Sequence, residues 1–304
     1  MRGLTHKVAL VTGAANGIGL AIAERLYQEG ATLALADWNE EQLAIVIEQF
    51  DSARVFAQKV DVSDPEQVQA LVRKTVERFG RLDILVNNAG IHIPGTVLEC
   101  SVQDWRRIAS VNIDGVVYCA MHALPELIKT RGCMVNTASV SGLGGDWGAA
   151  FYCATKGAVV NFTRALALDH GAQGVRINAV CPSLVKTNMT NGWPQAIRDQ
   201  FNERIALGRA AEPKDVRSLV QLAEQLDCQL IAEGVETRSE LLAIADLGIE
   251  LVQGYLFGRP QLTPQRIYHS QSFSSATVLN IESARTETPL QYLMFQDTPR
   301  MSAL

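Results

Sequence analysis

Short apolar runs alternate with amphipathic stretches along the first two thirds of the chain. The apolar runs are rich in Val, Leu, Ile and Ala and cover residues 8–13, 31–37, 54–62, 82–90, 134–139 and 175–181. The amphipathic stretches between the first four runs repeat apolar residues at helical spacing and cover residues 21–30, 41–50 and 68–80. Near-continuous apolar strands need helices over both faces of their sheet, because neither face can be left to water. The pattern therefore predicts an α/β fold with a doubly wound parallel sheet.

The pattern changes beyond about Val216. Helix-like and strand-like segments continue, at residues 218–227, 229–235, 239–248 and 251–258. From residue 259 onward the chain is rich in Ser, Thr and Gln and has no sustained periodicity, which indicates an irregular tail. We therefore predict a main domain of residues 1–216, an α/β fragment of residues 217–258 and a tail of residues 259–304.

Composition and charge limit the partners. Hydrophobic residues make up 47% of the chain, enough for a buried core. The 27 basic and 32 acidic residues give a net charge of −5, which offers no basic surface for nucleic acid or an anionic membrane. No long apolar span or signal-peptide pattern is present, so a cytoplasmic protein is expected. The six cysteines stand singly, without metal-ligand spacing to the five histidines, and are interpreted as small buried apolar residues; no metal site is expected.

A glycine-rich turn follows the first apolar run. Gly13, Gly17 and Gly19, with Asn16 and Ile18 between them, open a predicted helix. The free N–H groups and the dipole at such a helix start favour a pyrophosphate, and the glycines allow close approach. An ordinary glycine-rich turn is the alternative, but the position between a strand and a helix favours a dinucleotide site.

Two acidic residues end the next two apolar strands. Asp37 stands where a carboxylate accepts hydrogen bonds from the adenosine ribose hydroxyls. Its charge repels a 2′-phosphate, and residues 31–50 contain no Arg or Lys, so the sequence predicts NAD rather than NADP as cofactor. Asp61, followed by Val62, is a candidate for the adenine edge. A helix cap for Asp37 and a simple turn for Asp61 remain alternatives.

Further polar residues complete a known pattern. Tyr152 and Lys156 share one face of a predicted helix, Ser139 ends an upstream strand, Asn112 lies in a helix-like stretch, and residues 87–90 read Asn-Asn-Ala-Gly. In this order, together with the phosphate loop, the elements resemble the short-chain dehydrogenase/reductase family over residues 5 to about 216. The resemblance implies a Rossmann-like fold and an NAD-dependent oxidoreductase. It also implies cofactor contacts from Asn88, Ala89, Gly90, Pro182, Val185 and Thr187.

The resemblance further implies that Asn112, Ser139, Tyr152 and Lys156 are catalytic. A free phenol titrates at about 10, so the Lys156 ammonium, aided by the nicotinamide charge, is expected to lower the pKa of Tyr152 and make it the acid/base. Lys156 would also hold the nicotinamide ribose, and Ser139 would hydrogen-bond the substrate oxygen. Asn112 would fix a kinked helix and a water molecule; a helix cap is its alternative role.

Within the family, residues 104–117, 132–161 and 176–213 are similar to bacterial butanediol dehydrogenases. That likeness implies a small alcohol or ketone substrate, such as a vicinal diol and its hydroxyketone. Its pocket would be shaped by Ser139, Ser141, Asp146, Trp147 and Trp193. Reduction of a 3-oxoacyl thioester by the same residues is the alternative, because such folds change substrate by loop variation.

The C-terminal part resembles another family. Residues 231–237 and 252–260 are similar to the end of an EAL-type cyclic-di-GMP phosphodiesterase, with Glu233 and Gln253 at two of its site positions. The Glu-Ala-Leu motif is absent from the sequence, which argues against that activity. We expect the strand at 229–235 to complete or flank the main sheet.

This C-terminus replaces the segment through which the resembled family forms tetramers. We therefore expect a homodimer at most, through the helices near residues 105–130 and 152–170. A catalytically impaired dinucleotide-binding fusion and a regulatory module based on the EAL-like segment are the remaining alternatives.

Overall fold

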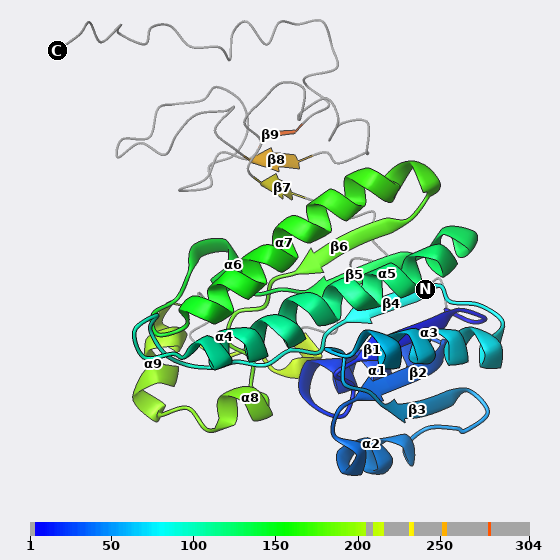
Figure 1. Ribbon diagram of the computed structural model, residues 1–304, viewed down its shortest axis with the longest axis horizontal. Coiled ribbons are helices and arrows are strands. Elements are labelled where there is room, and N and C mark those ends of the chain that lie inside the picture. Colours follow the sequence, from blue (N-terminus) through cyan, green and yellow to red (C-terminus); the bar gives the residue numbers. More distant parts are fainter. Residues whose placement is uncertain (1–3, 205–208, 216–230, 234–250, 254–278, 281–304) are drawn as a thin grey trace, which may run out of the picture. The chain divides into compact units, whose positions relative to one another are not determined.

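The computed structural model describes residues 4–204, 209–215, 231–233, 251–253 and 279–280 (Figure 1). The chain divides into two units, residues 1–225 and 226–304, which we describe separately. The boundary predicted at residue 216 lies outside the described residues, as does the tail from residue 259 apart from Leu279–Asn280.

A six-stranded parallel sheet forms the centre of the first unit, in the order β3-β2-β1-β4-β5-β6. Its strands are β1 Val8–Thr12, β2 Thr32–Asp37, β3 Val55–Lys59, β4 Ile84–Asn87, β5 Cys133–Thr137 and β6 Arg176–Val180. The strand order reverses between β1 and β4, and ligands of such sheets bind in the crevice beyond the carboxyl ends of the strands at that point. The predicted doubly wound parallel sheet is confirmed.

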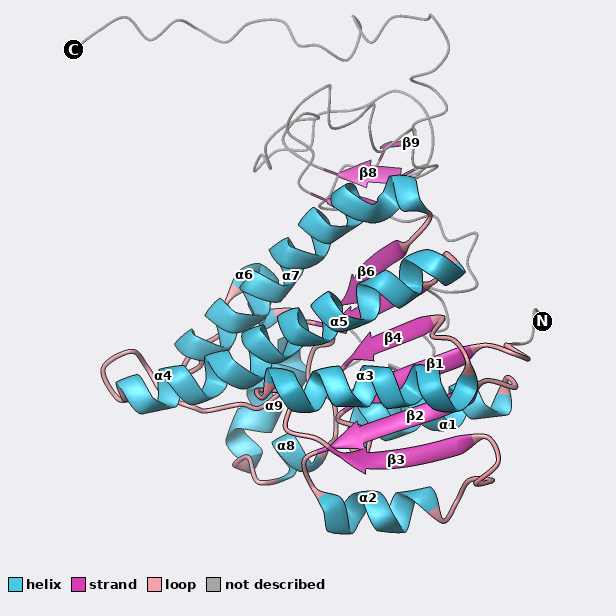
Figure 2. Cartoon of the chain, turned by 45° about the vertical axis from the view of Figure 1, so that its right-hand side comes forward, coloured by secondary structure: helices cyan, strands magenta, loops and turns pink. Residues whose placement is uncertain are grey.

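Helices cover both faces of this sheet (Figure 2). The α-helices are α1 Gly17–Gln28, α2 Glu40–Ile47, α3 Pro65–Phe79, α4 Val102–Ala109, α5 Gly115–Thr130, α6 Ser141–Gly144, α7 Ala150–His170, α8 Asn188–Asn191 and α9 Gln195–Arg204. A π-helical turn, η1 Ser110–Asp114, joins α4 to α5, and a 3-10 turn, η2 Gly171–Gln173, follows α7. Helices α6, α8 and α9 lie at the end toward which the strand arrows point (Figure 1).

Successive residues of a strand pack into two different hydrophobic cores, one on each face of the sheet. Ala9 and Val11 of β1 pack with α1 and α2, whereas Leu10 packs with α3 and α5. In register with Leu10, Ala34 of β2 and Leu85 of β4 face the same core. Because both faces of the strands are buried, the continuous apolar runs of the sequence are explained.

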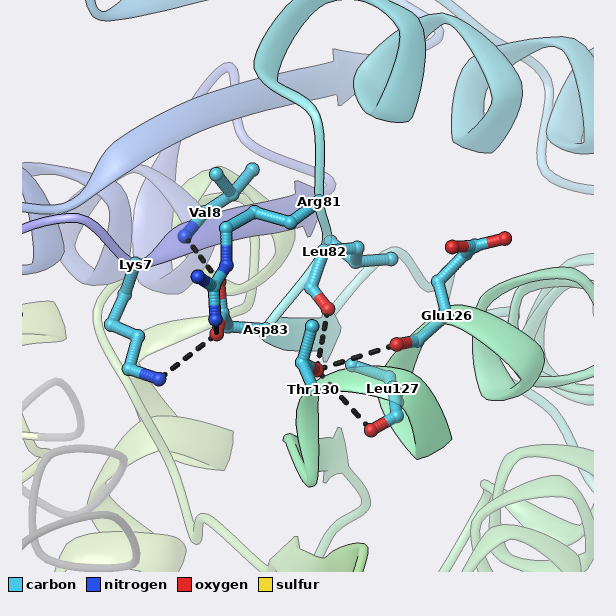
Figure 3. A network of polar contacts seen from close by, with 8 residues as sticks. All are labelled: Lys7, Val8, Arg81, Leu82, Asp83, Glu126, Leu127 and Thr130. Carbon is cyan, nitrogen blue, oxygen red and sulfur yellow. Dashed lines mark hydrogen bonds and ion pairs between the residues drawn. The ribbon is translucent and has the colours of Figure 1, made fainter.

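A buried carboxylate joins the central strands β1 and β4 at their amino-terminal ends (Figure 3). Asp83, at the start of β4, accepts hydrogen bonds from Lys7 Nζ at 2.9 Å, the Val8 N–H at 3.0 Å and Arg81 Nε at 2.7 Å. Burial alone would raise the pKa of Asp83, but these hydrogen bonds hold it below its usual value. The cluster therefore joins β1 to β4 far from the carboxyl ends of the strands.

The second unit contains a separate sheet in the order β7-β8-β9. Its strands are β7 Ile231–Glu233, β8 Leu251–Gln253 and β9 Leu279–Asn280. Strands β7 and β8 are parallel, with Ile231 opposite Leu251. In the described part of the chain, β7 is thus paired with β8, the next strand of its own segment. That the fragment completes or flanks the main sheet stays a prediction.

Three further observations concern the described residues alone. No helix there is long and apolar enough to cross a bilayer, and no group of three His, Cys, Asp or Glu side chains there could hold a metal ion. Cys119 and Cys133 are buried, as expected, and burial raises the pKa of the Cys119 thiol to about 12. The other three cysteines of the described part are only partly buried. Cys100 and Cys181 lie in loops, and Cys153 lies in the first turn of α7.

Candidate active site

A glycine-rich turn joins β1 to α1 at the point where the strand order reverses. Gly13 and Gly17 have φ angles of +65° and +57°, which L side chains rarely adopt. A Cβ on Gly13 would lie 2.9 Å from the backbone of the loop after β4, and one on Gly19 would overlap the Gly13 carbonyl oxygen. Asn16 is the N-cap residue of α1, and Ile18 packs against the core. The turn therefore leaves bare backbone beside the first N–H groups of α1.

Asp37 anchors this turn from the end of β2. Its Oδ2 accepts a hydrogen bond from the Ala15 N–H at 2.9 Å, and its Oδ1 accepts one from the Asn39 N–H at 2.9 Å. The cap of α2 is Asn39, whose side chain accepts from the Gln42 N–H, so the helix-cap alternative for Asp37 is excluded. The carboxylate, only 9% exposed, lies directly beside the glycine turn.

The loop after β4 is tied to the same turn by Asn88. Its Nδ2 donates to the carbonyl oxygens of Thr12 and Gly13, each at 3.1 Å. The N–H groups of Asn88 and Ala89 both donate to Thr12 Oγ1 at 3.1 Å. The predicted Asn-Asn-Ala-Gly loop and the glycine turn are therefore one connected structure.

Asp61 has the contacts of a turn residue. Its Oδ1 accepts from the N–H and Oγ of Ser63, at 2.9 and 2.7 Å, and the side chain is exposed. Val62 is buried against Gly115, where an added Cβ would lie 2.7 Å from a Val62 methyl group. The turn alternative for Asp61 is thus seen directly, and its adenine contact remains a prediction.

Residues after β6 approach the turn from another direction. The carbonyl of Pro182 accepts from Ser139 Oγ at 3.4 Å. Thr187 lies against Gly17, since a Cβ there would be 3.1 Å from the Thr187 methyl group. The Val185 side chain is buried in the core next to β1. The structure therefore brings Pro182 and Thr187 to the crevice and buries the side chain of Val185 beside it.

Asn112 lies inside the π-helical turn η1 and is fully buried. Its Nδ2 donates to the Ile91 carbonyl at 2.9 Å and to Thr155 Oγ1 at 3.1 Å, and its Oδ1 accepts from the Ile91 N–H at 2.8 Å. A Cβ on Gly90 would lie 3.3 Å from Asn112 Oδ1 and 3.4 Å from Lys156 Nζ. Asn112 thus holds the loop after β4 to α7 from a kinked helix, rather than capping a helix end.

Lys156 and Tyr152 lie on neighbouring turns of α7. Lys156 is 4% exposed, and its Nζ donates to the Thr137 carbonyl at 2.7 Å and lies 5.8 Å from the centre of the Tyr152 ring. A Cβ on Gly142 would clash with the Lys156 backbone, so α6 and α7 touch through their main chains. Burial lowers the pKa of Lys156 to about 8.

The surroundings of Tyr152 act on its pKa in the direction opposite to the prediction. Burial raises the pKa, a hydrogen bond with Ser139 lowers it, and nearby Cys153 and Asp146 raise it further; the net change is upward. The expected lowering by Lys156 is therefore not produced by the protein groups alone, because loss of hydration of the phenolate is the largest influence on this pKa.

Ser139 stands beside Tyr152 at the head of a short hydrogen-bonded chain. Ser139 Oγ donates to Ser141 Oγ at 3.1 Å, and Ser141 Oγ donates to Asp146 Oδ2 at 2.5 Å. The Ser141 N–H also donates to Ser139 Oγ, at 3.2 Å. Both serines are buried, and Ser141 belongs to the site because it is hydrogen-bonded to Ser139.

Aromatic rings cover Tyr152. The ring of His92 is 4.9 Å from that of Tyr152 and 5.4 Å from that of Trp193, which in turn lies 5.5 Å from Phe201. Burial lowers the pKa of His92, and Asp146 partly opposes this. These rings form an aromatic wall that reaches Tyr152 through His92.

Sequence reasoning missed His92 and Phe201. His92 lies two residues after the Asn-Asn-Ala-Gly segment, in the loop that follows β4, and that position was an available signal. Phe201 lies on α9, and only the tertiary fold brings it near. Of the predicted pocket residues, Trp193 lies in this wall, whereas Trp147 is 83% exposed.

These residues fit a nicotinamide dinucleotide. The glycine turn leaves space that any Cβ would fill, Asp37 places a carboxylate next to it, and the Tyr152–Lys156 pair lies at the other end of the loop after β4.

Comparison with known proteins supports this interpretation. The model of the short chain dehydrogenase family matches residues 7–198, and the EAL domain model matches residues 204–260. The meso-2,3-butanediol dehydrogenase of Serratia marcescens is 60% identical over 226 residues, which cover 74% of this chain and 90% of that protein. The 3-oxoacyl-[acyl-carrier-protein] reductase FabG of Thermotoga maritima is 36% identical over 220 residues, 71% of this chain and 89% of that protein.

A solved structure gives the same picture. The 3-ketoacyl-(acyl-carrier-protein) reductase from Brucella melitensis, crystallised with NADH, matches with a TM-score of 0.70 and 29% identity, over 74% of this chain and 93% of that one. The chain therefore belongs to the short chain dehydrogenase family, whose members are oxidoreductases that use a nicotinamide dinucleotide.

Proposed function

We propose that this protein interconverts a small secondary alcohol or vicinal diol and its ketone, of the 2,3-butanediol and acetoin type, with NAD as cofactor. The observation that carries the chemistry is the placement of Tyr152 between Ser139 and the buried Lys156. The similarity to the Serratia marcescens butanediol dehydrogenase supports the substrate class.

The cofactor would be held by its pyrophosphate on the glycine turn and by its adenosine ribose on Asp37. This carboxylate disfavours a 2′-phosphate, which supports NAD over NADP. The bound nicotinamide supplies or accepts the hydride. Lys156 would bind the nicotinamide ribose, and Thr187 would lie beside the carboxamide.

Tyr152 would donate a proton to the carbonyl oxygen during reduction and accept it during oxidation. Ser139 would hydrogen-bond the same oxygen as negative charge develops on it. Asn112 would act by holding the kink at η1 and the loop after β4. The aromatic wall of His92 and Trp193 limits the substrate to a small one.

We also propose a homodimer built on the helices near residues 105–130 and 152–170. Exposed apolar side chains on these helices support it: Met121 is 62% and Leu168 is 73% exposed. An apolar hollow lined by Val102, Trp105 and Phe151 adjoins them. Light scattering of the full chain tests the proposal; a monomer at all concentrations contradicts it.

The activity is tested by following NADH absorbance with acetoin, 2,3-butanediol and an acetoacetyl thioester in parallel. We expect turnover of the first two and loss of turnover in Tyr152→Phe with NAD affinity retained. Preference for the thioester would establish the 3-oxoacyl reductase alternative. Binding of NAD without any turnover would identify an impaired fusion protein.

A further inference from the structure

We propose that His92 determines substrate specificity: its imidazole hydrogen-bonds the second oxygen of a vicinal diol or hydroxyketone while Tyr152 exchanges a proton with the first. The proposal deepens the proposed function and rests on it, since it takes Tyr152 as the acid/base. It gives His92 a polar role in addition to its place in the aromatic wall.

The backbone just before His92 is held in place by a buried side chain. The N–H of Ile91 donates to Asn112 Oδ1 at 2.8 Å, and the Ile91 carbonyl accepts from Asn112 Nδ2 at 2.9 Å. Both polar backbone groups of the preceding residue are therefore tied to the fully buried Asn112. His92 thus starts from a fixed point in the loop after β4, as a residue that orients a substrate must.

The ring of His92 lies beside the reacting group. Its centre is 4.9 Å from that of the Tyr152 ring, at an interplanar angle of 65°, and 5.4 Å from that of Trp193. Two aromatic contacts therefore hold the imidazole next to the phenol. A vicinal diol carries its second oxygen on the carbon next to the reacting one, so this oxygen must also lie close to Tyr152.

The polar atoms of the imidazole are available to a ligand. Within the part of the chain that the structure describes, neither ring nitrogen of His92 has a hydrogen-bond partner, and neither is sealed from solvent. The side chain as a whole is half-buried. Such a group gains from a ligand atom that hydrogen-bonds it, because its hydration is already incomplete.

The protonation state of His92 suits both kinds of oxygen. Burial lowers the pKa of His92, and Asp146 opposes this only in part, so the ring is neutral at neutral pH. A neutral imidazole donates through one nitrogen and accepts through the other, so it can serve a carbonyl or a hydroxyl. By contrast, the Trp193 indole can only donate, and an ionised carboxylate such as Asp146 can only accept.

No charge on His92 contributes to the pKa of Tyr152. The protein groups that shift this pKa, in addition to burial, are Ser139, Cys153 and Asp146. Because the imidazole is neutral, His92→Phe removes no charge from the site and keeps a ring in the wall. This variant therefore removes the proposed hydrogen bond and leaves the acid/base in place.

The experiment compares substrates with and without the second oxygen, on the full chain with NADH or NAD. Acetoin is paired with 2-butanone, and 2,3-butanediol with 2-butanol. In His92→Phe we expect kcat/KM to fall about tenfold for acetoin and 2,3-butanediol, mainly through KM, because a hydrogen bond made both before and during the reaction is lost. The values for 2-butanone and 2-butanol should change by less than about threefold.

Two further variants serve as controls. His92→Gln retains a donor and an acceptor without the ring, so it should keep more of the preference for acetoin over 2-butanone than His92→Phe does. His170→Phe removes an imidazole at the other end of α7, where it is hydrogen-bonded to Gln173, and should leave the preference unchanged. A thermal melt of each variant verifies that it is folded.

Binding is measured separately from turnover, in Tyr152→Phe protein supplied with NADH. Acetoin should raise the melting temperature more than 2-butanone does at equal concentration. In the double variant that also carries His92→Phe, the two compounds should act alike.

The outcomes are distinct. A preference for acetoin over 2-butanone that survives in His92→Phe overturns the proposal. Equal losses with all four substrates also overturn it, because His92 would then act by its shape alone. If the wild type turns over none of the four, the proposed function fails, and the binding comparison still decides whether His92 recognises the second oxygen.

Discussion

The Lys156 ammonium donates a 2.7 Å hydrogen bond to the carbonyl oxygen of Thr137, the last residue of β5. This bond fixes the middle of α7 to the strand that leads into Ser139. Tyr152 and Ser139 are thereby held at one place although they come from different elements. It also explains how a side chain that is 4% exposed retains a partner for its charge.

Burial of Lys156 predicts a pH dependence of stability. Its pKa is about 8 in the folded protein and 10.5 when exposed, so the unfolded chain binds more protons between these values. The contribution of Lys156 to the free energy of unfolding should therefore rise as pH increases from about 8 to 10.5, by on the order of 3 kcal/mol. Denaturant titrations of wild type and Lys156→Met, compared across this range, measure it. Parallel curves for the two proteins would contradict the assigned burial.

The Asp83 cluster predicts a pH dependence of the same sign, but in the acid range. The folded-state pKa of Asp83 is lowered, so its stabilisation is present above the ordinary carboxyl pKa and is lost as pH falls through the folded value. Asp83→Asn should lower the free energy of unfolding by about 1–3 kcal/mol at neutral pH, because Lys7 and Arg81 lose their partner. The difference from wild type should shrink in acid. Asp51→Asn, at an exposed turn, is the control and should change stability little.

Asp37 should decide the preference between cofactors. Asp37→Asn removes the charge while leaving one acceptor for the Ala15 N–H. We expect NAD to bind about tenfold more weakly, since a hydrogen bond to a charged group is worth about 1.5 kcal/mol or more. The ratio of NADP to NAD affinity should rise. Calorimetric titration with both cofactors checks this, and an unchanged ratio would remove Asp37 from the ribose site.

Gly19 should tolerate no side chain. In Gly19→Ala the new methyl group would overlap the Gly13 carbonyl oxygen, so the turn must shift and cofactor affinity should fall at least tenfold. Gly171→Ala is the matched control, because a Cβ there meets nothing within 4 Å. Melting temperatures with and without NAD report the loss: ligand-induced stabilisation should disappear in the first variant and persist in the second.

The pattern of the sequence determined the sheet, the covering helices and the glycine turn. These are local properties: strands buried on both faces must be apolar throughout, and a turn with positive φ and close backbone contact requires glycine. The candidate site was predicted through the resemblance to the short-chain dehydrogenase/reductase family, which rests on the order and spacing of residues such as Asn112, Ser139, Tyr152 and Lys156.

Only the tertiary structure decided how these residues act on one another. The raised pKa of Tyr152 and the lowered pKa of Lys156 come from burial, which depends on every element packed around them. The wall of His92, Trp193 and Phe201 joins segments far apart in sequence. The pairing of β7 with β8 is a choice between alternative strand partners, and periodicity within one strand carries no information about that choice.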